Sequence, residues 1–351
     1  MRQVPREMDG REVPMVTVHE TLAVRVLLGS GARSAVPEEV ARLSARRVFL
    51  VVTPSASAAG DELAGALGPL LGARFDRPAP HTPVAVTDAA MATAAGADCV
   101  VAVGGGSAIG LSKAIAARTG VPQIAVPTTY AGSEATPVLG ETSDGVKTTR
   151  RDPALAPGVI VYDPDLTVTM PAGLTRTSAL NALAHAVEAL WAPNATPVTD
   201  ALATEAVAGI LQSLPEVLAS PAETAPRARL QSASWLAALC LSQVRMGLHH
   251  QLAHVLGGTY GLPHAELHSL LLPHVLAFNL PHSETARTRL AHTIEPIRRL
   301  SQAYDGPTTL SALGVPYADL PSVAERVAAS PYPNPRELTV PDVTALLEAA
   351  W

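Results

Sequence analysis

The side chains best suited to chemistry in this chain are histidines gathered between residues 247 and 273. This segment holds five of the eleven histidines, namely His249, His250, His254, His264 and His268. Because the unperturbed pKa of imidazole lies close to neutral, such a group can donate protons, bind anions or hold a metal. We therefore expect residues 247–273 to form one wall of an active site.

Helical spacing brings further polar side chains to the same place. His250 and His254 are four residues apart, and the upstream pair Asn181 and His185 repeats that spacing, with Glu188 one turn further on. Residues four apart on a helix share a face. The helices could thus present five side chains to one cleft: Asn181, His185, His250, His254 and His264.

Ordinary roles compete with this interpretation. For His249, His268 and His274 a buried or helix-capping histidine is the favoured reading. Residues 250–254 match the zinc-protease pattern HExxH except that Gln251 replaces the glutamate base, which argues against that class of enzyme. In contrast, apolar helical stretches surround three other histidines: His185, His250 and His254. A buried imidazole that forms no hydrogen bond is unfavourable there, so a functional role is favoured for these three.

A glycine-rich loop forms a second candidate site far upstream. Gly104, Gly105, Gly106 and Ser107 follow an apolar run at residues 98–103, which predicts a buried strand, and they precede a predicted helix. Glycines let the backbone approach a pyrophosphate closely, and the free N–H groups of a helix start favour negative charge. The run matches neither GxGxxG nor the Walker phosphate loop, and a tight strand-to-helix turn would also explain it.

The neighbouring strand ends favour a nucleotide at this loop. Residues 127–134, after a strand expected at 124–126, are mostly polar and include Thr128, Thr129 and Ser133. In parallel sheets, ligands bind at the carboxyl ends of the strands. The strand expected at residues 47–53 ends in Thr53, with no carboxylate to bind a ribose 2′-hydroxyl, which leaves both NADH and NADPH open.

Strands and helices alternate in the first half of the chain and give way to helices in the second. This order predicts an α/β fold with a doubly wound, Rossmann-like parallel sheet over residues 16–170 and an all-helical domain over residues 171–351. We expect a disordered tail at residues 1–15 and a strand or hairpin at 16–28. The helices expected in the second domain cover residues 175–191, 200–214, 227–256 and 265–278.

Composition restricts the class of protein. A length of 351 residues suggests two domains, and a net charge of −6 argues against nucleic-acid binding but not against an anionic small substrate. No apolar run approaches the ~20 residues of a membrane span, and the charged N-terminal segment is unlike a signal peptide, so we expect a cytoplasmic protein. Cys99 and Cys240 lie in apolar runs and are expected to be buried thiols.

Five segments together resemble maleylacetate reductases, a branch of the iron-containing alcohol dehydrogenase superfamily. They read GGGSAIGLSKAIA, PTTYAGSEATPVLGETSDGVKTTRRDP, SALNALAHAVEALW, MGLHHQLAHVLGGTYGLPHAELH and YPNPR. The superfamily shares its fold with glycerol dehydrogenase and dehydroquinate synthase. The resemblance implies a Rossmann-like domain, a helical domain, a nicotinamide cofactor in the cleft between them, and a homodimer.

The resemblance also implies roles for individual residues of the cofactor domain. The loop from Gly104 to Ser107 would hold the pyrophosphate. Lys147 would lie near the nicotinamide half of the cofactor. Thr128, Thr129 and Ser133 would contact adenosine and ribose, and Thr53 is a further candidate cofactor residue.

A metal-free site follows from the same resemblance. In metal-dependent relatives an Asp and three His bind iron or zinc, and the matching positions here are Asn181, His185, His250 and His264. An amide oxygen binds a divalent transition metal more weakly than a carboxylate and adds no negative charge. Maleylacetate reductases resemble this chain in carrying Asn there, so we expect no metal; were one present, those four residues would hold it.

The implied reaction reduces a carbon–carbon double bond conjugated to a ketone, in a substrate with a carboxylate at each end. Hydride from C4 of NADH or NADPH adds to the carbon β to the ketone, and charge develops on the ketone oxygen. Imidazolium groups can stabilise this enolate and supply the proton. We assign His250 as the leading acid or enolate stabiliser, assisted by His185 and His254. The side chains expected to orient the carboxylates are Asn181, His264, His81 and Arg245.

Four positions depart from the family pattern. Gln251 stands where the family usually has Lys, Ala253 where it has Cys, Ala179 where it has Gly and Leu267 where it has Thr. The changes at Gln251 and Leu267 point to a larger or less charged substrate than maleylacetate. Three alternatives stay open: a metal-dependent alcohol dehydrogenase, a biosynthetic lyase or cyclase that reuses the fold, and a catalytically silent binding protein.

Overall fold

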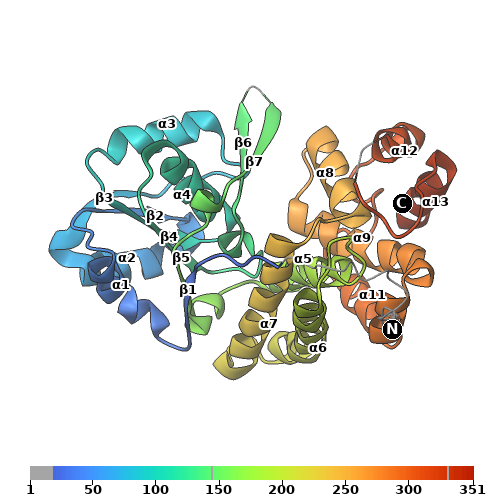
Figure 1. Cartoon of the computed structure of the whole chain (residues 1–351), viewed down its shortest axis with the longest axis horizontal. Helices are drawn as coiled ribbons and strands as arrows, with labels where there is room; N and C mark the ends of the chain where they lie inside the picture. The colour runs from blue at the N-terminus through green and yellow to red at the C-terminus, as the bar shows by residue number, and fades with distance from the viewer. Residues whose placement is uncertain (1–18, 144, 330–331) are drawn as a thin grey trace, which may run out of the picture.

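The computed structural model describes residues 19–143, 145–329 and 332–351, which form a part built on a sheet and a helical part (Figure 1). The tail expected at residues 1–15 lies outside the described residues. From residue 172 onward, the described segments contain helices and no strand. The expected fold class, an α/β domain followed by a helical domain, is confirmed.

Six parallel strands form the sheet, in the order β1-β8-β5-β4-β2-β3. Strands β2, β4, β5 and β8 are buried along their whole length, which is why they read as continuous apolar runs. The chain order reverses between β2 and β4, so their carboxyl ends form the switch point where such sheets bind ligands. The strand bounds are β1 Arg25–Leu28, β2 Val48–Val52, β3 Leu71–Phe75, β4 Cys99–Gly104, β5 Gln123–Pro127 and β8 Val159–Tyr162.

Helices cover both faces of this sheet. Helices α1 (Val36–Arg42) and α2 (Ser57–Leu67) lie on one face, and α3 (Val84–Thr93) and α4 (Gly106–Thr119) lie on the other (Figure 1). The strand side chains alternate to match: Leu50 packs in the apolar cluster with α1 and α2, and its neighbour Phe49 packs with α3 and α4. This is the two-residue period of a strand buried on both faces.

Two features of the sheet region differ from the sequence-based expectation. Within the described residues, the strand expected at 16–28 is the four-residue β1. The sequence also does not predict the antiparallel hairpin of β6 (Val138–Ser143) and β7 (Val146–Arg151), because its polar residues carry no clear apolar period. In Figure 1 the hairpin rises at the boundary between the two parts, on the side of α8 (Leu248–Tyr260).

Helix α5 (Ala172–Ala189) runs through the centre of the helical part (Figure 1). Fourteen of its eighteen residues are buried, because neighbouring helices surround it, among them α6 (Pro197–Ala219), α7 (Thr224–Gln243) and α9 (His264–Asn279). Polar side chains on such a helix need partners inside the protein. The other helices are α8 Leu248–Tyr260, α10 Glu284–Leu290, α11 Ile294–Gln302, α12 Leu320–Ala328 and α13 Val340–Ala350.

The prediction of a single helix over residues 227–256 is wrong. The structure has two helices, α7 and α8, separated by residues 244–247. Val244 is extended, with φ −112° and ψ 163°, and Gly247 is the N-cap of α8. A Cβ at Gly247 would lie 2.7 Å from the Pro333 carbonyl oxygen, so glycine is what allows that loop to approach. The break places His249 and His250 in the first turn of a helix instead of in its middle.

Cys99 and Cys240 are both buried and both free, as expected. Burial raises the pKa of each thiol to about 12, so neither forms a thiolate at neutral pH. In the ranges that the structure covers, no helix is long and apolar enough to cross a membrane.

Candidate active site

The glycine-rich loop lies at the switch point of the sheet. Gly104 ends β4, Gly105 is the N-cap of α4, and Gly106 and the half-buried Ser107 begin that helix. Gly104 has a φ of +146°, and a Cβ there would lie 2.4 Å from Thr53 Oγ1, so glycine is required. No side chain of the described residues caps α4, and the first N–H groups of this 14-residue helix can therefore bind an anion.

Thr128 and Thr129 border the same loop. The Thr128 N–H donates to the Gly104 carbonyl over 3.1 Å. A Cβ at Gly105 would lie 3.0 Å from Thr129 Cγ2, so this threonine closes one side of the loop. The structure thus brings the candidate cofactor residues of three separate segments together at the start of one helix.

A buried lysine fixes the segment that follows β5. The Nζ atom of Lys113, on α4, donates to the carbonyl oxygens of Ser133 (2.6 Å) and Val138 (2.9 Å), and to the carbonyl and hydroxyl of Thr136 (2.8 and 3.0 Å). Burial lowers the pKa of Lys113 to about 7, whereas four oxygen acceptors favour the ammonium form. Ser133 is thereby tied to the helix that starts at the glycine loop.

Gly132 lies where the domain that contains the sheet contacts the helical domain. It has a φ of +79°, and a Cβ on it would lie 2.8 Å from Ala238 Cβ and 3.7 Å from His185 Nδ1. Close by, the Tyr130 N–H donates to Ser178 Oγ on α5 over 3.0 Å. Glycine at position 132 therefore lets the segment after β5 lie directly against α5 and α7.

Six imidazoles from three helices form a group that we call the histidine cluster. Neighbouring ring centroids in it lie 4.4–5.5 Å apart. The structure thus brings together the four histidines that the sequence assigns to one cleft, with Asn181 one turn before them on α5. The members are His185 from α5, His249, His250 and His254 from α8, and His264 and His268 from α9.

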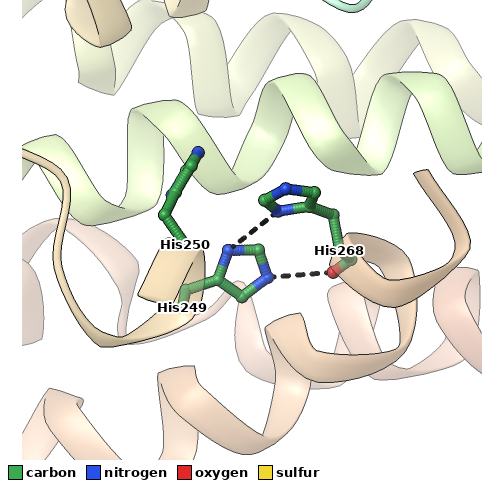
Figure 2. A group of neighbouring side chains, drawn as sticks. All are labelled: His249, His250 and His268. Atoms are coloured by element: carbon green, nitrogen blue, oxygen red, sulfur yellow. Dashed lines mark hydrogen bonds between the residues drawn. The ribbon is translucent and has the colours of Figure 1, made fainter. Parts of the chain in front are cut away.

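His249 and His268 belong to the cluster although the sequence favours an ordinary role for them. Figure 2 shows His249 Nε2 facing the His268 carbonyl oxygen (3.0 Å) and His249 Nδ1 facing His268 Nδ1 (3.2 Å). Burial lowers the pKa of both rings, that of His249 to about 4, so both are neutral. Because a carbonyl only accepts, His249 carries its proton on Nε2, and His268 must donate from Nδ1.

The same reasoning extends to His264. His268 Nε2 has no proton once Nδ1 carries it, and it lies 3.0 Å from His264 Nε2, which therefore donates. One backbone carbonyl thus sets the tautomers of three imidazoles. His274, further along α9, lies outside the cluster; it lines a separate cavity of about 590 Å³ together with Arg298 and Arg336.

Glu188 and His250 form a buried pair, with His250 Nδ1 2.6 Å from Glu188 Oε2 and side-chain exposures of 6% and 0%. The carboxylate also accepts the N–H groups of Gly247 (3.0 Å) and His249 (2.8 Å). Burial raises the pKa of Glu188, but these donors favour the ionised form. Burial, and then the nearby His254, lower the pKa of His250 to about 3. The pair is therefore a neutral imidazole that donates from Nδ1 to a carboxylate.

Three buried polar atoms beside this pair have no hydrogen-bond partner within the described part of the chain. They are Asn181 Oδ1, His185 Nδ1 and His250 Nε2. Burial lowers the pKa of His185 well below its usual value, so its ring is neutral as well. Buried polar atoms are nearly always paired in folded proteins, so unpaired ones mark the place of a ligand or of water. These three atoms are therefore candidates for contact with a ligand.

His254 and His264 form the more open side of the cluster. Their rings are stacked, with centroids 5.5 Å apart and planes 10° apart. His254 is exposed, and its Nδ1 lies 3.3 Å from the hydroxyl of Tyr332, the first residue of YPNPR. This segment is fixed in turn by paired amides, since Asn334 and Asn279 bond to each other over 2.7 and 2.9 Å.

Three predicted site residues lie outside the buried part of the cluster. Arg245 is exposed between α7 and α8, and the bond in which it takes part runs from its backbone N–H to Asn194 Oδ1 (2.9 Å). His81 is on an exposed loop before α3 with a φ of +62°, and its carbonyl accepts from Thr142 in the hairpin. Lys147 lies opposite Thr142 in β7, and its side chain is not described. The roles of these three residues stay predictions.

The family relationship follows from comparison with known proteins. Models of the iron-containing alcohol dehydrogenase and of the C-terminal region of that family match residues 23–164 and 175–351. Maleylacetate reductase 1 of Rhodococcus opacus is 44% identical over 335 residues, which cover 93% of this chain and 94% of that protein. The chain belongs to the maleylacetate reductase branch of the iron-containing alcohol dehydrogenase family. It is an oxidoreductase.

Other members of the branch agree in sequence and in structure. The maleylacetate reductase of Rhizobium sp. strain MTP-10005 is 43% identical over 348 residues, covering 95% of this chain and 97% of that protein. The crystal structure of maleylacetate reductase from Agrobacterium tumefaciens superposes with a TM-score of 0.92 at 40% identity, covering 96% of this chain and 99% of that one. The resemblance and the fold predicted from the five segments are thus confirmed.

The structure corrects the interpretation of two departures from the family pattern. The Gln251 amide, 1% exposed, donates to the Val327 carbonyl and so turns toward α12. Leu267 is fully buried in the apolar core of the helical domain. Neither side chain faces the unpaired atoms of the cluster, so neither argues for a less charged substrate.

Sequence reasoning missed the partners of the candidate catalytic histidines. The spacing of Glu188 was the one feature of this residue that the sequence revealed, and Tyr332 was recognised only as part of the YPNPR segment. A signal for Glu188 was present, because Asn181, His185 and Glu188 follow the i, i+4, i+7 pattern of one helix face. No local pattern indicates that Tyr332 reaches His254, 78 residues away in the chain.

Proposed function

We propose that this chain reduces maleylacetate, or a closely related conjugated oxo acid, with NADH or NADPH as hydride donor. The observation that carries the proposal is the contact at Gly132, where the segment next to the glycine-loop site lies against His185. A dinucleotide bound at the start of α4 would extend along that segment toward the histidine cluster. The substrate is suggested by the relatives, which are named maleylacetate reductases.

The bound cofactor would supply a hydride from C4 of its nicotinamide. The hydride adds to the carbon β to the ketone, the electron pair of the double bond moves to the ketone oxygen, and a proton then reaches the α carbon. His250 Nε2 and His185 Nδ1 have open hydrogen-bonding capacity and, when protonated, could donate to the enolate oxygen, whereas Asn181 Oδ1 can only accept a hydrogen bond.

His250 needs the substrate in order to act as an acid. In the free protein its ring is neutral, with a pKa lowered to about 3. A dianionic substrate and an enolate place negative charge beside this ring, which raises its pKa and favours a proton on Nε2. Glu188, on the other side of the ring, stabilises the imidazolium in the same way. His250 would then deliver that proton to the substrate.

We further propose that the reaction does not use the iron implied by the family name. The four matching positions supply only uncharged ligand atoms to a metal ion, and one of them, Asn181, is an amide. His264 Nε2 is already bonded to His268. Among the described residues, the three histidines that can each offer one ring nitrogen within 4.8 Å of the others are instead His249, His250 and His268 (Figure 2). Both nitrogens of His249 are engaged there, so these residues do not fit the family's ion.

Turnover by the wild type and by a His250→Ala variant tests the reaction. We expect maleylacetate-dependent oxidation of NADH or NADPH, and a kcat in the variant ~10²–10³ lower, because an oxyanion-stabilising group is lost. A His274→Ala variant, altered outside the cluster, is the matched control and should retain activity. A wild type that oxidises neither cofactor contradicts the proposal, and near-normal turnover by His250→Ala removes that residue from the mechanism.

Metal removal separates the proposal from a metal-dependent alcohol dehydrogenase. Protein purified without chelators is expected to hold less than stoichiometric iron or zinc and to keep its kcat after dialysis against EDTA. Stoichiometric metal, with activity lost on dialysis, would favour the dehydrogenase. Binding of NADH, followed by its fluorescence, excludes a silent scaffold, and oxidation of NADH with substrate excludes a lyase without net redox change.

A further inference from the structure

Glu188 is a charged residue that the proposed reaction does not use directly, yet it is bonded to the central imidazole. Its side chain has no solvent exposure. Taking a carboxylate out of water is costly unless several donors compensate. Here three donors do so, from Gly247, His249 and His250, all within four consecutive residues of the chain.

The carboxylate caps a helix other than its own. Glu188 belongs to α5, and it accepts the N–H groups of Gly247, the N-cap of the 13-residue α8, and of His249 in the first turn. Negative charge at a helix N-terminus is stabilised by the unpaired N–H groups and by the helix dipole. A Cβ at Gly247 would approach Glu188 Oε1 to 3.1 Å, so glycine leaves room for this contact. The position of the carboxylate relative to His250 is thus set from both helices.

This arrangement decides which nitrogen of His250 carries the proton. Both oxygens of Glu188 face donors: Oε1 accepts from His249 N–H, and Oε2 accepts from Gly247 N–H and lies 2.6 Å from His250 Nδ1. An ionised carboxylate can only accept, so Nδ1 is protonated and Nε2 keeps its lone pair. Nε2 is also one of the three buried atoms without a partner in the described chain.

We propose that Glu188 is a positioning residue that presents the unprotonated Nε2 of His250 to the substrate. This rests on the proposed function for what the nitrogen then does, but the tautomer itself is a property of the free protein. Two other buried rings of the cluster, His249 and His268, take their tautomers from a backbone carbonyl. His250 takes its own from a charged group, which also favours the imidazolium when Nε2 accepts a proton.

A Glu188→Gln variant tests the proposal with almost no change in shape. An amide has one accepting oxygen and one donating NH₂ group. If the NH₂ group takes the place of Oε1, it faces the His249 N–H, and two donors oppose each other. If it takes the place of Oε2, it donates to His250 Nδ1, which must then accept and leave the proton on Nε2. We expect a kcat on the order of 10²-fold lower, as for other groups that fix a histidine tautomer. The KM for maleylacetate and the Kd for NADH should change far less.

The direct readout is the ¹⁵N spectrum of the histidine side chains, recorded without substrate or cofactor. The signals of His250 are those missing from His250→Ala. We expect a protonated Nδ1 and a bare Nε2 in the wild type, and loss of that pattern in Glu188→Gln. A wild type with the proton on Nε2 overturns the proposal without any variant, and so does a folded Glu188→Gln with unchanged tautomer and unchanged kcat.

Asp200→Asn is the matched control, since Asp200 is also a buried carboxylate of the helical domain, on α6 and outside the cluster. The Asp200→Asn variant should leave the His250 spectrum and kcat unchanged. If it changes both as much as Glu188→Gln does, Glu188 has only a structural role. The proposed function and the proposed role of Glu188 can be contradicted independently of each other. If the wild type does not reduce maleylacetate but shows a bare Nε2, the function is wrong and the positioning stands.

Discussion

Two buried imidazoles of the histidine cluster, His249 and His250, take their protonation state from an oxygen that accepts a hydrogen bond from the ring. The carbonyl of His268 accepts from His249, and the carboxylate of Glu188 accepts from His250. Burial lowers the pKa of these rings, so they are neutral in the free protein and respond to charge that a ligand brings. At this scale the chemistry depends on where single protons are placed.

The glycine loop gives a prediction at the residue scale. Gly104→Ala is expected to cost about 1–3 kcal/mol of stability, because a φ of +146° is strained for other residues and the new Cβ would lie 2.4 Å from Thr53 Oγ1. The affinity for NADH should fall as the loop shifts. Urea unfolding and NADH fluorescence measure the two effects.

Gly65→Ala serves as the control for that variant. Gly65 lies on the exposed side of α2, where an added Cβ meets nothing within 4 Å. It should be neutral or stabilising, since alanine favours a helix. If Gly104→Ala binds NADH as tightly as the wild type, the loop is not the pyrophosphate site.

At the scale of elements, the site depends on contacts between segments that end near one another. Helix α8 begins where it does because Gly247 admits the Glu188 carboxylate, so α5 sets the start of the helix that carries three of the histidines. In the cofactor domain, α4 fixes the segment after β5 through Lys113. The second contact keeps Gly132 and Ser133 at the edge where the domains meet.

Lys113→Met gives a prediction for the second contact. Methionine fills a similar volume but leaves buried carbonyls without their donor, so we expect a loss of about 1–3 kcal/mol in the free energy of unfolding, measured by urea titration. Arg118→Met is the control on the same helix. Arg118 is 31% exposed and pairs with Glu141 over 2.8 Å, and loss of such a pair costs about 0–1 kcal/mol. Equal losses in the two variants would contradict a special role for Lys113.

At the scale of the whole molecule, neither domain holds a complete site. In the proposed site, the glycine loop belongs to the sheet domain and the unpaired atoms belong to α5 and α8, and the two domains are in contact at Gly132. A second contact across the boundary runs from the Arg151 guanidinium, at the base of the hairpin, to the Ser242 carbonyl near the end of α7. A hydride can pass only between groups in contact, so a reductase of this design needs both domains in one chain.

Patterns that act over a few residues were readable in advance. Continuous apolar runs predicted the buried strands β2, β4, β5 and β8, because a strand covered on both faces needs apolar side chains at every position. The glycines predicted the turn between β4 and α4, and four-residue spacing placed Asn181 and His185 on one face of a helix. The hairpin β6–β7 was not predictable, because its residues carry no such period.

The amino-acid sequence by itself determined the fold class, the glycine-rich turn before α4 and the presence of a histidine-rich wall, since these follow from local period and composition. Only the tertiary structure decided which nitrogen is unprotonated in His249, His250 and His268. That depends on partners distant in the chain: Glu188 and His250 are 62 residues apart, and His249 and His268 are 19 apart. It also divided one expected helix into α7 and α8, because a helix can start where a carboxylate from elsewhere caps its N–H groups. Packing brings such partners together, and no local pattern records them.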